Sequence, residues 1–273
     1  MSDPAEGAQV RVAIFGAGGR MGAAIARLAA ASPDRYRVVG AIDQPDCPHL
    51  GRDVGEVAGV GPMGVAVDAD VASGLLGADV VIDFSLAPAF ATIAHAASTA
   101  GVPLVSGTTS LDAASQRRLD EAATVIPVLW APNMSVGVQV LADVVARAIA
   151  QLGLDYDVEI VETHHNRKAD APSGTATLLQ ETAQGVRQGL RPVHGREGAV
   201  GARASDEIGV HAVRGGGVVG DHAVHLIGAH DRLELSHRAM NRDLFAAGAL
   251  RAAAWLAGHA KRPGRYRLAD TLT

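Results

Sequence analysis

Strand-like and helix-like stretches alternate through the first half of the chain. Predominantly apolar runs, each of a length typical of strands buried on both faces, span residues 10–15, 36–42, 79–84, 102–106 and 126–130. Stretches with apolar residues at the helical period lie between them, at residues 20–31, 88–100 and 111–123. This alternation predicts an α/β fold, with a doubly wound parallel sheet that has helices on both faces.

The pattern changes after residue 134. Ser135 is placed to cap a long helix that ends near residue 152, and a second helical stretch covers 174–188. Strand-like runs separated by glycines and charged residues span 156–163, 208–213, 218–227 and 233–237. They predict an α+β domain with an open antiparallel or mixed sheet. A final amphipathic helix at 244–257 is expected to pack back on the first domain.

These patterns divide the chain into two domains. We expect residues 1–134 and 243–273 to form one domain, and residues 135–242 to form the other. A length of 273 residues suits one large domain or two moderate ones. Because only 3% of the residues are aromatic, the interior must be built from Ala, Val, Leu and Ile.

Charge and cysteine content exclude several classes of protein. The formal net charge of −5 disfavours nucleic acid or an anionic membrane surface as a partner. Cys47 is the single cysteine, which excludes an intrachain disulfide and a cysteine-rich zinc site. The first nine residues are polar and unlike a signal peptide, and Asp143 and Arg147 interrupt the most apolar helix. We therefore expect a cytoplasmic protein without a membrane span.

A glycine turn follows the first strand. It reads Gly16-Ala17-Gly18-Gly19-Arg20-Met21-Gly22 and leads directly into a helix. Glycines allow a tight turn and let backbone N–H groups approach a pyrophosphate, which then sits at the positive end of the helix dipole. An ordinary tight turn is the alternative, but the strand–turn–helix context favours nucleotide binding.

Asp43 ends the second strand and is placed to accept hydrogen bonds from the adenosine ribose hydroxyls. Its alternative role is that of an ordinary turn carboxylate. Gln44 follows it, so no adjacent cation neutralises a 2′-phosphate, and Arg20 is the nearest candidate for that role. We therefore predict NADH as the preferred cofactor, with NADPH also accepted.

Two further loops follow strands of the same predicted sheet. They read Gly107-Thr108-Thr109 and Ala131-Pro132-Asn133-Met134. Ligands of open α/β sheets bind outside the carboxyl ends of the strands, so both loops are expected near the nicotinamide half of the cofactor. Turn chemistry alone would also account for either loop.

Residues 164–175 hold the densest functional chemistry in the chain. The segment reads His164-His165-Asn166-Arg167-Lys168-Ala169-Asp170-Ala171-Pro172-Ser173-Gly174-Thr175. Imidazoles, cations and a helix-opening Ser-Gly-Thr suit a small anionic substrate that must also receive a proton. We expect His164 to donate or relay that proton, and Lys168 either to protonate the substrate or to hold it.

Other residues near this segment have more limited roles. Ser173, Gly174 and Thr175 are expected to form an anion-binding nest, and Arg242 to add a cation from a distant segment. Arg167 is either a solvated charge or an intersubunit contact. The histidines after residue 220 match no metal-ligand spacing, so we expect no metal site.

These motifs together resemble the 4-hydroxy-tetrahydrodipicolinate reductase (dihydrodipicolinate reductase) family of lysine and diaminopimelate biosynthesis. Besides the glycine turn and the loops above, the likeness includes Asp83-Phe84-Ser85, Glu162 to Lys168, Asp170 to Thr175, Gly220-Asp221-His222 and residues 236–242. It covers essentially the whole chain. Many relatives carry a basic residue where Gln44 stands, which puts efficient NADPH use in doubt.

The resemblance implies that residues 1–134 and 243–273 form a Rossmann-type dinucleotide-binding domain and that residues 135–242 form a substrate-binding and oligomerisation domain. It also implies a reaction and a set of residue roles. The reaction is NAD(P)H-dependent reduction of (2S,4S)-4-hydroxy-2,3,4,5-tetrahydrodipicolinate, a small cyclic dicarboxylate, to (S)-2,3,4,5-tetrahydrodipicolinate with loss of water. It implies a homotetramer assembled through the second domain. It also implies that the cofactor contacts Gly16 to Met21, Asp43 and both loops, that His164 and Lys168 are the acid–base residues, and that His165, Gly174 and Thr175 bind substrate.

Two alternatives belong to other classes. One is another nicotinamide-dependent reductase of a small amino-acid-like acid, such as a semialdehyde or homoserine dehydrogenase. A semialdehyde dehydrogenase needs a nucleophilic cysteine, and Cys47 lies in a proline-rich loop near the amino terminus. The other is a redox sensor that binds NAD(H) without turnover, which leaves His164 and Lys168 without a purpose.

Overall fold

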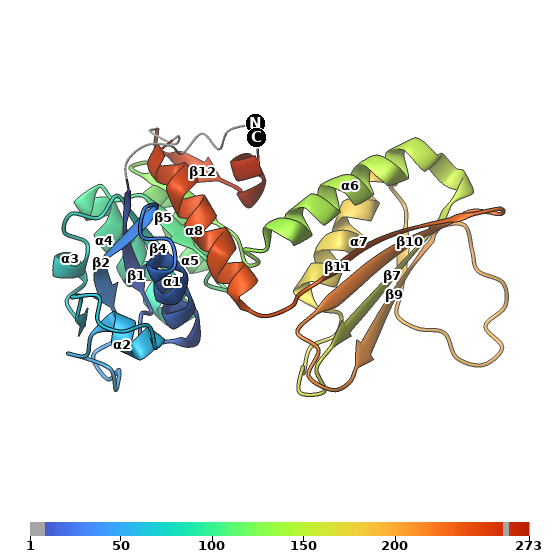
Figure 1. The fold of residues 1–273 in the computed structure, drawn as a ribbon. Coiled ribbons are helices and arrows are strands. Elements are labelled where there is room, and N and C mark those ends of the chain that lie inside the picture. The colour runs from blue at the N-terminus through green and yellow to red at the C-terminus, as the bar shows by residue number, and fades with distance from the viewer. Residues whose placement is uncertain (1–8, 259–261, 273) are drawn as a thin grey trace. The chain divides into compact units, whose positions relative to one another are not determined.

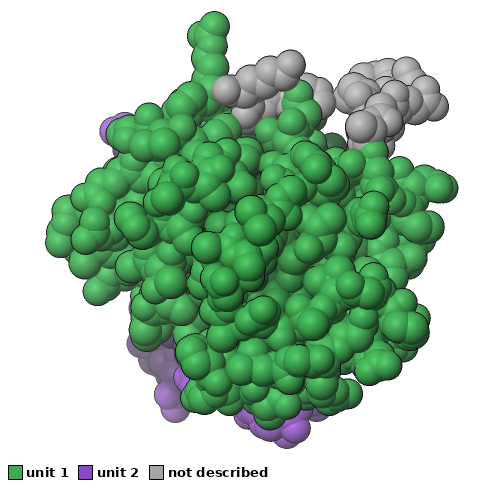
Figure 2. Space-filling model, turned by 90° about the vertical axis from the view of Figure 1, so that its left-hand side faces the viewer, with its two compact units in different colours: residues 1–134, 243–273 green, residues 135–242 purple. Residues whose placement is uncertain are grey.

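The computed structural model describes residues 9–258 and 262–272, and the chain forms two compact units. Unit 1 comprises Met1–Met134 and Asp243–Thr273, and unit 2 comprises Ser135–Arg242, so the units change at the residues where the sequence pattern changes. Figure 2 colours the two units separately. The polar segment at residues 1–8 lies outside the described residues.

Among the described residues, unit 1 contains a parallel sheet of seven strands in the order β12-β6-β5-β4-β1-β2-β3. The strands are β1 (Val10–Phe15), β2 (Tyr36–Ile42), β3 (Val67–Asp68), β4 (Val80–Asp83), β5 (Leu104–Ser106), β6 (Pro127–Trp130) and β12 (Gly264–Tyr266). β1 pairs with β2 on one side and with β4 on the other, so the strand order reverses at β1. This reversal marks the carboxyl ends of β1 and β4 as the ligand-binding edge.

Helices cover both faces of this sheet (Figure 1). The helices in the described part of unit 1 are α1 (Arg20–Ala30), α2 (Val54–Ala58), α3 (Val71–Gly74), α4 (Phe90–Ala100), α5 (Ala113–Ala123) and α8 (Asp243–Gly258), with 3₁₀ turns at Ala87–Ala89 and Leu268–Leu272. α1 and α8 enclose one apolar core with Ile14 and Ile82, and α4 and α5 enclose another with Phe15 and Val81. The predicted doubly wound fold is confirmed, including the return of the last long helix to the first sheet.

In the described part of unit 2, five strands form a mixed sheet in the order β11-β10-β7-β9-β8. They are β7 (Asp157–His164), β8 (Arg191–Val193), β9 (Glu207–Arg214), β10 (Asp221–Ile227) and β11 (Arg232–Arg238). β10 is antiparallel to both β7 and β11, whereas β9 is parallel to β7 and β8. The predicted open mixed sheet is therefore confirmed.

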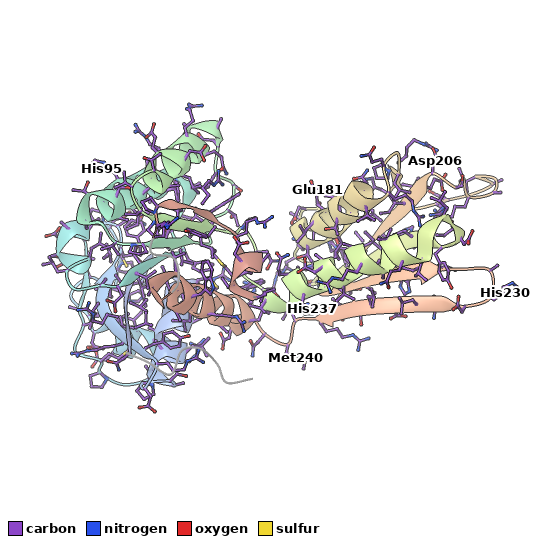
Figure 3. The ribbon with its side chains drawn as sticks, turned by 90° about the horizontal axis from the view of Figure 1, so that it is seen from above. His95, Glu181, Asp206, His230, His237 and Met240 are labelled. Atoms are coloured by element: carbon purple, nitrogen blue, oxygen red, sulfur yellow. The ribbon has the colours of Figure 1, made fainter. Side chains whose placement is uncertain are left out.

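Two helices, α6 (Val136–Leu152) and α7 (Gly174–Val186), pack on one face of this sheet, and a 3₁₀ turn at Gly153–Asp155 follows α6. Side chains of β7 alternate in burial, and Val158 and Ile160 face the helices. At the start of α6, His237 of β11 lies against Gly137, where a Cβ would stand 2.8 Å from the imidazole (Figure 3). Glycine thus lets α6 approach the sheet closely.

The segment Val136–Asp155, which contains α6, is long and apolar enough to cross a membrane by length and composition, with a mean hydropathy of 1.4. Core helices of globular domains meet the same criterion. Leu141, Val145 and Ile149 of this helix are buried in the apolar core of unit 2. This face of the helix packs on α7 and the second sheet, whereas Val140 and Val144 of the same helix are exposed.

Candidate active site

The glycine turn after β1 is shaped by contacts that leave no room for side chains. Gly16 has a φ of +84°, which glycine adopts without steric cost. A Cβ at Gly22 would lie 2.3 Å from the carbonyl oxygen of Gly16, and one at Gly18 would lie 2.6 Å from Sγ of Cys47. The turn therefore holds α1 tightly against β1 and leaves bare backbone facing the ligand-binding edge.

The backbone donors of this turn are distributed differently from our expectation. The N–H groups of Gly16 and Ala17 donate to the carbonyl of Ile42, and the N–H of Gly19 donates to Gly16 at 3.1 Å. The N–H of Gly18 donates to Asp43. Donors of the glycine turn itself are thus engaged within the protein, so the N–H groups that suit a pyrophosphate are those of the first turn of α1.

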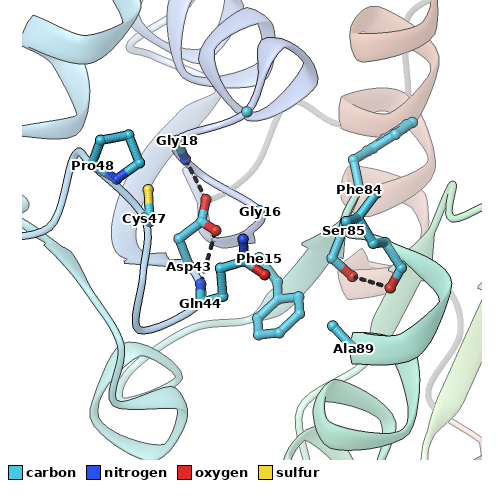
Figure 4. Close-up of a pocket in the computed structure, with 12 residues that line it drawn as sticks. Phe15, Gly16, Gly18, Asp43, Gln44, Cys47, Pro48, Phe84, Ser85 and Ala89 are labelled. Carbon is cyan, nitrogen blue, oxygen red and sulfur yellow. Dashed lines mark hydrogen bonds between the residues drawn. The ribbon is translucent and has the colours of Figure 1, made fainter.

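Asp43 connects β2 to the glycine turn. Its Oδ2 accepts from the N–H of Gly18 at 2.7 Å, and its Oδ1 accepts from the N–H of Gln44 at 2.8 Å (Figure 4). An ionised carboxylate has about four acceptor positions, so two remain for ribose hydroxyls. The surrounding pocket is lined by Phe15, Gly16, Gly18, Gly19, Asp43, Gln44, Cys47, Pro48, Phe84, Ser85, Leu86 and Ala89.

A buried carboxylate organises the neighbouring loops. Asp83, at the end of β4, is fully buried and accepts from the hydroxyls of Ser106 and Thr108 at 2.7 and 2.8 Å. It also accepts from the N–H of Ser85 at 2.9 Å. Asp83 thereby fixes the loops that follow β4 and β5. Sequence reasoning assigned it no role, although an acid at the end of an apolar strand is itself a signal.

The predicted nicotinamide loops lie at this same edge of unit 1, but not all of their side chains face outward. Thr108 is only 2% exposed and Met134 only 1% exposed, whereas Thr109 and Pro132 are exposed. The indole of Trp130 donates to the carbonyl of Thr108 at 2.9 Å. Thr108 and Met134 therefore act chiefly as anchors of their loops. Ala131 and Asn133 are partly buried, and Gly107 is buried against the Phe84 ring.

His164 is the last residue of β7 and lies on the face that carries the helices. Because β7 alternates regularly, Glu162 and His164 share this face with the apolar residues Val158 and Ile160. Nδ1 of His164 lies 2.5 Å from Oε2 of Glu162. Glu162 is fully buried and His164 is 8% exposed. The strand thus delivers an imidazole–carboxylate pair to its carboxyl end.

Glu162 is compensated by several donors. Arg214 at the end of β9 donates to both of its carboxylate oxygens at 2.8 Å, and the N–H of Ser173 donates at 3.1 Å. Burial acts to raise the pKa of Glu162, but the hydrogen bonds from Arg214 and His164 outweigh it and leave that pKa below its ordinary value. Glu162 is therefore an ionised carboxylate at neutral pH.

Ser173 caps α7, and its polar atoms contact groups of the protein instead of being left for a ligand as we expected. Its Oγ accepts from the N–H of Ala176 at 3.2 Å and lies 3.0 Å from Nε2 of His222, while its N–H is taken up by Glu162. Ser173 is 3% exposed. In the predicted nest, Ser173 therefore supports the helix start, and the exposed backbone of Gly174 faces solvent.

His222 lies beside His164. The ring centroids are 5.1 Å apart with an interplanar angle of 74°, an edge-on contact. Burial lowers the pKa of His222 to about 4, and the His164 ring acts in the same direction. His222 is thus neutral at physiological pH, so it does not compete with His164 as a source of protons.

The cations predicted from the sequence, Lys168 and Arg242, lie near other predicted site residues of unit 2. Lys168 pairs with Asp170 at 2.8 Å, and its side chain is 19% exposed. Burial lowers the pKa of His165, with the charges of Arg242 and Arg167 acting in the same direction. The structure therefore brings Arg242, from the far end of unit 2, into electrostatic range of His165. Thr175 lies in the first turn of α7.

Two members of this cluster, Glu162 and Arg214, had no role predicted from the sequence. Glu162 reads in the sequence as one of several acids on an alternating strand, and Arg214 lies far along the chain. An acid on the same strand face as buried apolar residues signals a compensated carboxylate. The partner Arg214 has no such local signal, because β7 and β9 become neighbours only in the folded sheet.

A doubly wound parallel unit with a glycine turn and an acid at the end of β2, joined to a unit with an imidazole–carboxylate pair, defines a two-domain, nicotinamide-dependent oxidoreductase. Comparison with known families gives the particular one. The family model for "Dihydrodipicolinate reductase, N-terminus" matches residues 10–134, and that for "Dihydrodipicolinate reductase, C-terminus" matches residues 137–272. The chain belongs to the dihydrodipicolinate reductase family, and it uses NAD(P)H as an oxidoreductase of that family.

Individual relatives agree over nearly the full length. The chain is 48% identical to the 4-hydroxy-tetrahydrodipicolinate reductase of Anaeromyxobacter sp. (strain Fw109-5), covering 96% of this chain and 97% of the relative. It is 44% identical to that of Myxococcus xanthus (strain DK1622), again over 96% and 97%. The solved dipicolinate-bound dihydrodipicolinate reductase from Paenisporosarcina sp. TG-14 superposes with a TM-score of 0.76 and 25% identity, over 95% of this chain and 97% of that one.

Proposed function

We propose that this protein reduces (2S,4S)-4-hydroxy-2,3,4,5-tetrahydrodipicolinate to (S)-2,3,4,5-tetrahydrodipicolinate with loss of water, in lysine and diaminopimelate biosynthesis. Membership of the family supports this reaction. The observation that carries the chemistry is the 2.5 Å pair of His164 and Glu162 at the end of β7, near the cations of the 164–175 segment. Reduction consumes one hydride and one proton and releases water.

We propose that the dinucleotide binds to unit 1. The bare glycine turn, the start of α1 with Arg20 and Met21, and the pocket beside Asp43 suit its phosphates and adenosine ribose. The loops at Gly107–Thr109 and Ala131–Met134 would border the nicotinamide, with Thr108 and Met134 as anchors. When bound, the reduced nicotinamide supplies the hydride.

NADH is the proposed preferred cofactor. The Asp43 carboxylate suits a ribose that carries two free hydroxyls and repels a 2′-phosphate. Gln44, which follows Asp43 in the same pocket, offers no charge to neutralise that phosphate. Arg20 is the nearest cation in the sequence, and its exposed side chain would contact a 2′-phosphate only weakly.

The substrate dicarboxylate is proposed to bind among the residues of unit 2. Lys168 offers a compact cation with three donors, and Arg242 contributes a second positive charge near His165. The backbone at Gly174 and Thr175 opens α7 and presents donors at the positive end of a 13-residue helix. Opposite charges about 4 Å apart attract by about 4 kcal/mol at an effective dielectric near 20, before desolvation.

His164 is the proposed proton donor. Loss of water from the 4-hydroxy group leaves a conjugated imine, and hydride addition at ring C4 converts it to an enamine. The enamine carbon must then take a proton, which an imidazole relays readily at neutral pH. Lys168 acts beside it as the second proposed acid–base residue, holding the substrate as the charge on the ring changes.

The assembly is proposed to be a cytoplasmic homotetramer, as the resemblance implies. The second sheet supports an assembly surface, because its strands carry exposed apolar side chains, among them Val213 at 47%, Ile227 at 38% and Leu233 at 40%. Sedimentation analysis of the purified protein tests the stoichiometry, and a monomer at micromolar concentration would contradict it.

The rival functions find less support. Cys47 lines the unit 1 pocket beside Asp43, in the part proposed for the adenosine ribose, whereas the nucleophile of a semialdehyde dehydrogenase must lie beside the nicotinamide. The direct test of the proposed function is oxidation of NADH, followed at 340 nm, with substrate generated enzymatically from pyruvate and aspartate semialdehyde. Turnover inhibited by pyridine-2,6-dicarboxylate is expected. Dinucleotide binding without turnover would instead indicate a sensor.

A further inference from the structure

Glu162 is an ionised group placed entirely inside unit 2, with a side chain that is 0% exposed. Burying a charge costs several kcal/mol unless donors replace the lost water. Four donors meet it here: two from Arg214, the N–H of Ser173 and Nδ1 of His164. Such complete compensation shows that this carboxylate is a fixed part of the site.

The contact between Glu162 and His164 defines where the imidazole carries its proton. An ionised carboxylate only accepts hydrogen bonds, so the nitrogen 2.5 Å from it must carry hydrogen. In the neutral imidazole this places the proton on Nδ1. Nε2 is then the nitrogen with a lone pair, which can take up a proton and pass it on.

Gly220 keeps the space beside Nε2 open. A Cβ added at Gly220 would lie 3.0 Å from Nε2 of His164 and 3.4 Å from its Cδ2. That separation is tighter than an ordinary van der Waals contact. Nε2 thus faces a backbone position without a side chain, while Nδ1 faces Glu162. Nδ1 therefore binds Glu162, and Nε2 is the nitrogen available to exchange a proton.

We propose that Glu162 is the positioning residue of His164: it fixes the proton on Nδ1 and orients the ring so that Nε2 relays the proton to the substrate. This inference rests on the proposed function, in which His164 is the proton donor. The carboxylate also fixes the N-cap residue Ser173, so the same group locks the end of β7 to the start of α7. Glu162 therefore holds the imidazole of His164 and the start of α7 in a fixed position relative to each other.

Glu162→Gln tests this role with a nearly unchanged side-chain shape. One oxygen becomes an NH₂ group, which cannot accept a hydrogen bond. Because Arg214 donates to both oxygens, it loses one contact in either orientation, so the second donor at each oxygen decides which way the amide turns. The backbone N–H of Ser173 always remains a donor. The neutral imidazole of His164 can instead change tautomer, with its proton on Nε2 rather than on Nδ1. The amide nitrogen is therefore expected to face His164, which then accepts at Nδ1.

The readouts are the imidazole tautomer and the steady-state kinetics. Long-range ¹H–¹⁵N correlation spectra of the full-length protein at alkaline pH, where imidazole is neutral, report the protonated nitrogen. We expect Nδ1–H in the wild type and Nε2–H in Glu162→Gln. We further expect kcat to fall by about 100-fold, in line with losses of groups that orient a catalytic imidazole, with KM changed by less than about threefold.

Glu159→Gln is the matched control. Glu159 is on the same strand and also ion-paired, but it faces the other side of β7 and contacts Arg196, Arg203 and His211. The control should leave the His164 tautomer unchanged and kcat within about twofold. In the double variant Glu162→Gln/His164→Gln, kcat should match His164→Gln alone, because residues that act through one another are not additive.

The outcomes separate this inference from the proposed function. Wild-type His164 protonated on Nε2, or an unchanged tautomer in a folded Glu162→Gln variant, would overturn the positioning role whatever the activity. The wild-type spectrum decides the point even where the variant fails to fold. Additive losses in the double variant also contradict it. A wild-type protein without reductase turnover but with Nδ1–H would reject the proposed reaction alone.

Discussion

The carboxylate of Asp43 accepts the N–H of Gly18 at 2.7 Å, which ties the end of β2 to the turn after β1. Any group that displaces Gly18 therefore also displaces the acid proposed to bind the ribose. Gly18 and Asp43 lie in the same pocket wall, with Cys47 beside them. The glycine turn and the ribose acid behave as one structural unit.

Gly18→Ala should weaken dinucleotide binding. The new Cβ would lie 2.6 Å from Sγ of Cys47 and 3.1 Å from Oδ2 of Asp43, so both must move. We expect the Kd for NADH, measured by fluorescence titration, to rise at least about tenfold, or by about 1.4 kcal/mol. Gly185→Ala, at a helical position with no neighbour within 4 Å, is the control. An unchanged Kd in Gly18→Ala would contradict this account of the turn.

Gln44→Arg should improve the use of NADPH. A guanidinium at this position could neutralise the 2′-phosphate that Asp43 disfavours. We expect kcat/KM with NADPH to rise by about tenfold, with the value for NADH changed by less than about threefold. In the wild type, the ratio should favour NADH. A wild-type kcat/KM at least about tenfold higher with NADPH would show that this account of Asp43 is wrong.

Gly220→Ala should slow turnover without loss of the fold. The methyl group would stand 3.0 Å from Nε2 of His164, so the ring must shift away from its relay position. We expect kcat to fall by about tenfold, since small misplacements of catalytic groups are costly. Gly217→Ala, in the segment before β10 and with nothing within 4 Å, should keep wild-type kcat. Equal rates for the two variants would argue against the assignment of Nε2.

Glu159→Gln should destabilise the protein in a pH-dependent manner. Burial opposes ionisation of Glu159, but Arg196, His211 and Arg203 outweigh it and lower its pKa from 4.5 to about 2. A pKa lowered in the folded state gives stability that is fully present above about 4.5 and lost as the pH falls towards 2.

Urea unfolding at several pH values measures this effect. At pH 7 the variant should lose on the order of 2 kcal/mol of unfolding free energy, allowing for solvent screening of the pair. The difference between wild type and variant should shrink by about half near pH 3. A difference that stays constant over this range would mean that the carboxylate charge contributes nothing through these contacts.

Much of the fold could be predicted from the sequence because its long elements carry strong periodic signals. The runs behind β1, β2 and β10, and the Ser135 cap of α6, are local features. Shorter elements such as β3, with two residues, and α3, with four, lack a full period. β3 is fixed by its pairing with β2, which exists only in the folded sheet, and α3 begins at a local cap, Asp70.

The candidate site was predicted less completely than the fold. His164 and Lys168 stand out locally because they fall in one polar segment. Glu162 and Asp83 do not, because their roles depend on donors from β9 and from the loop after β5. Ser173 was expected to offer its donors to a ligand, but its N–H donates to Glu162 and its Oγ is in hydrogen-bond contact with Nε2 of His222. Such pairings join residues far apart in the chain.

The central claim is that His164, held by Glu162, gives the proton that completes the reduction. The direct measurement is kcat and KM of His164→Gln with the enzymatically generated substrate, beside His95→Gln, an exposed position on α4 (Figure 3). Loss of a positioned general acid predicts a kcat at least about 100-fold lower in His164→Gln, with KM and the Kd of pyridine-2,6-dicarboxylate nearly unchanged. Turnover close to that of the wild type and of His95→Gln would contradict the claim.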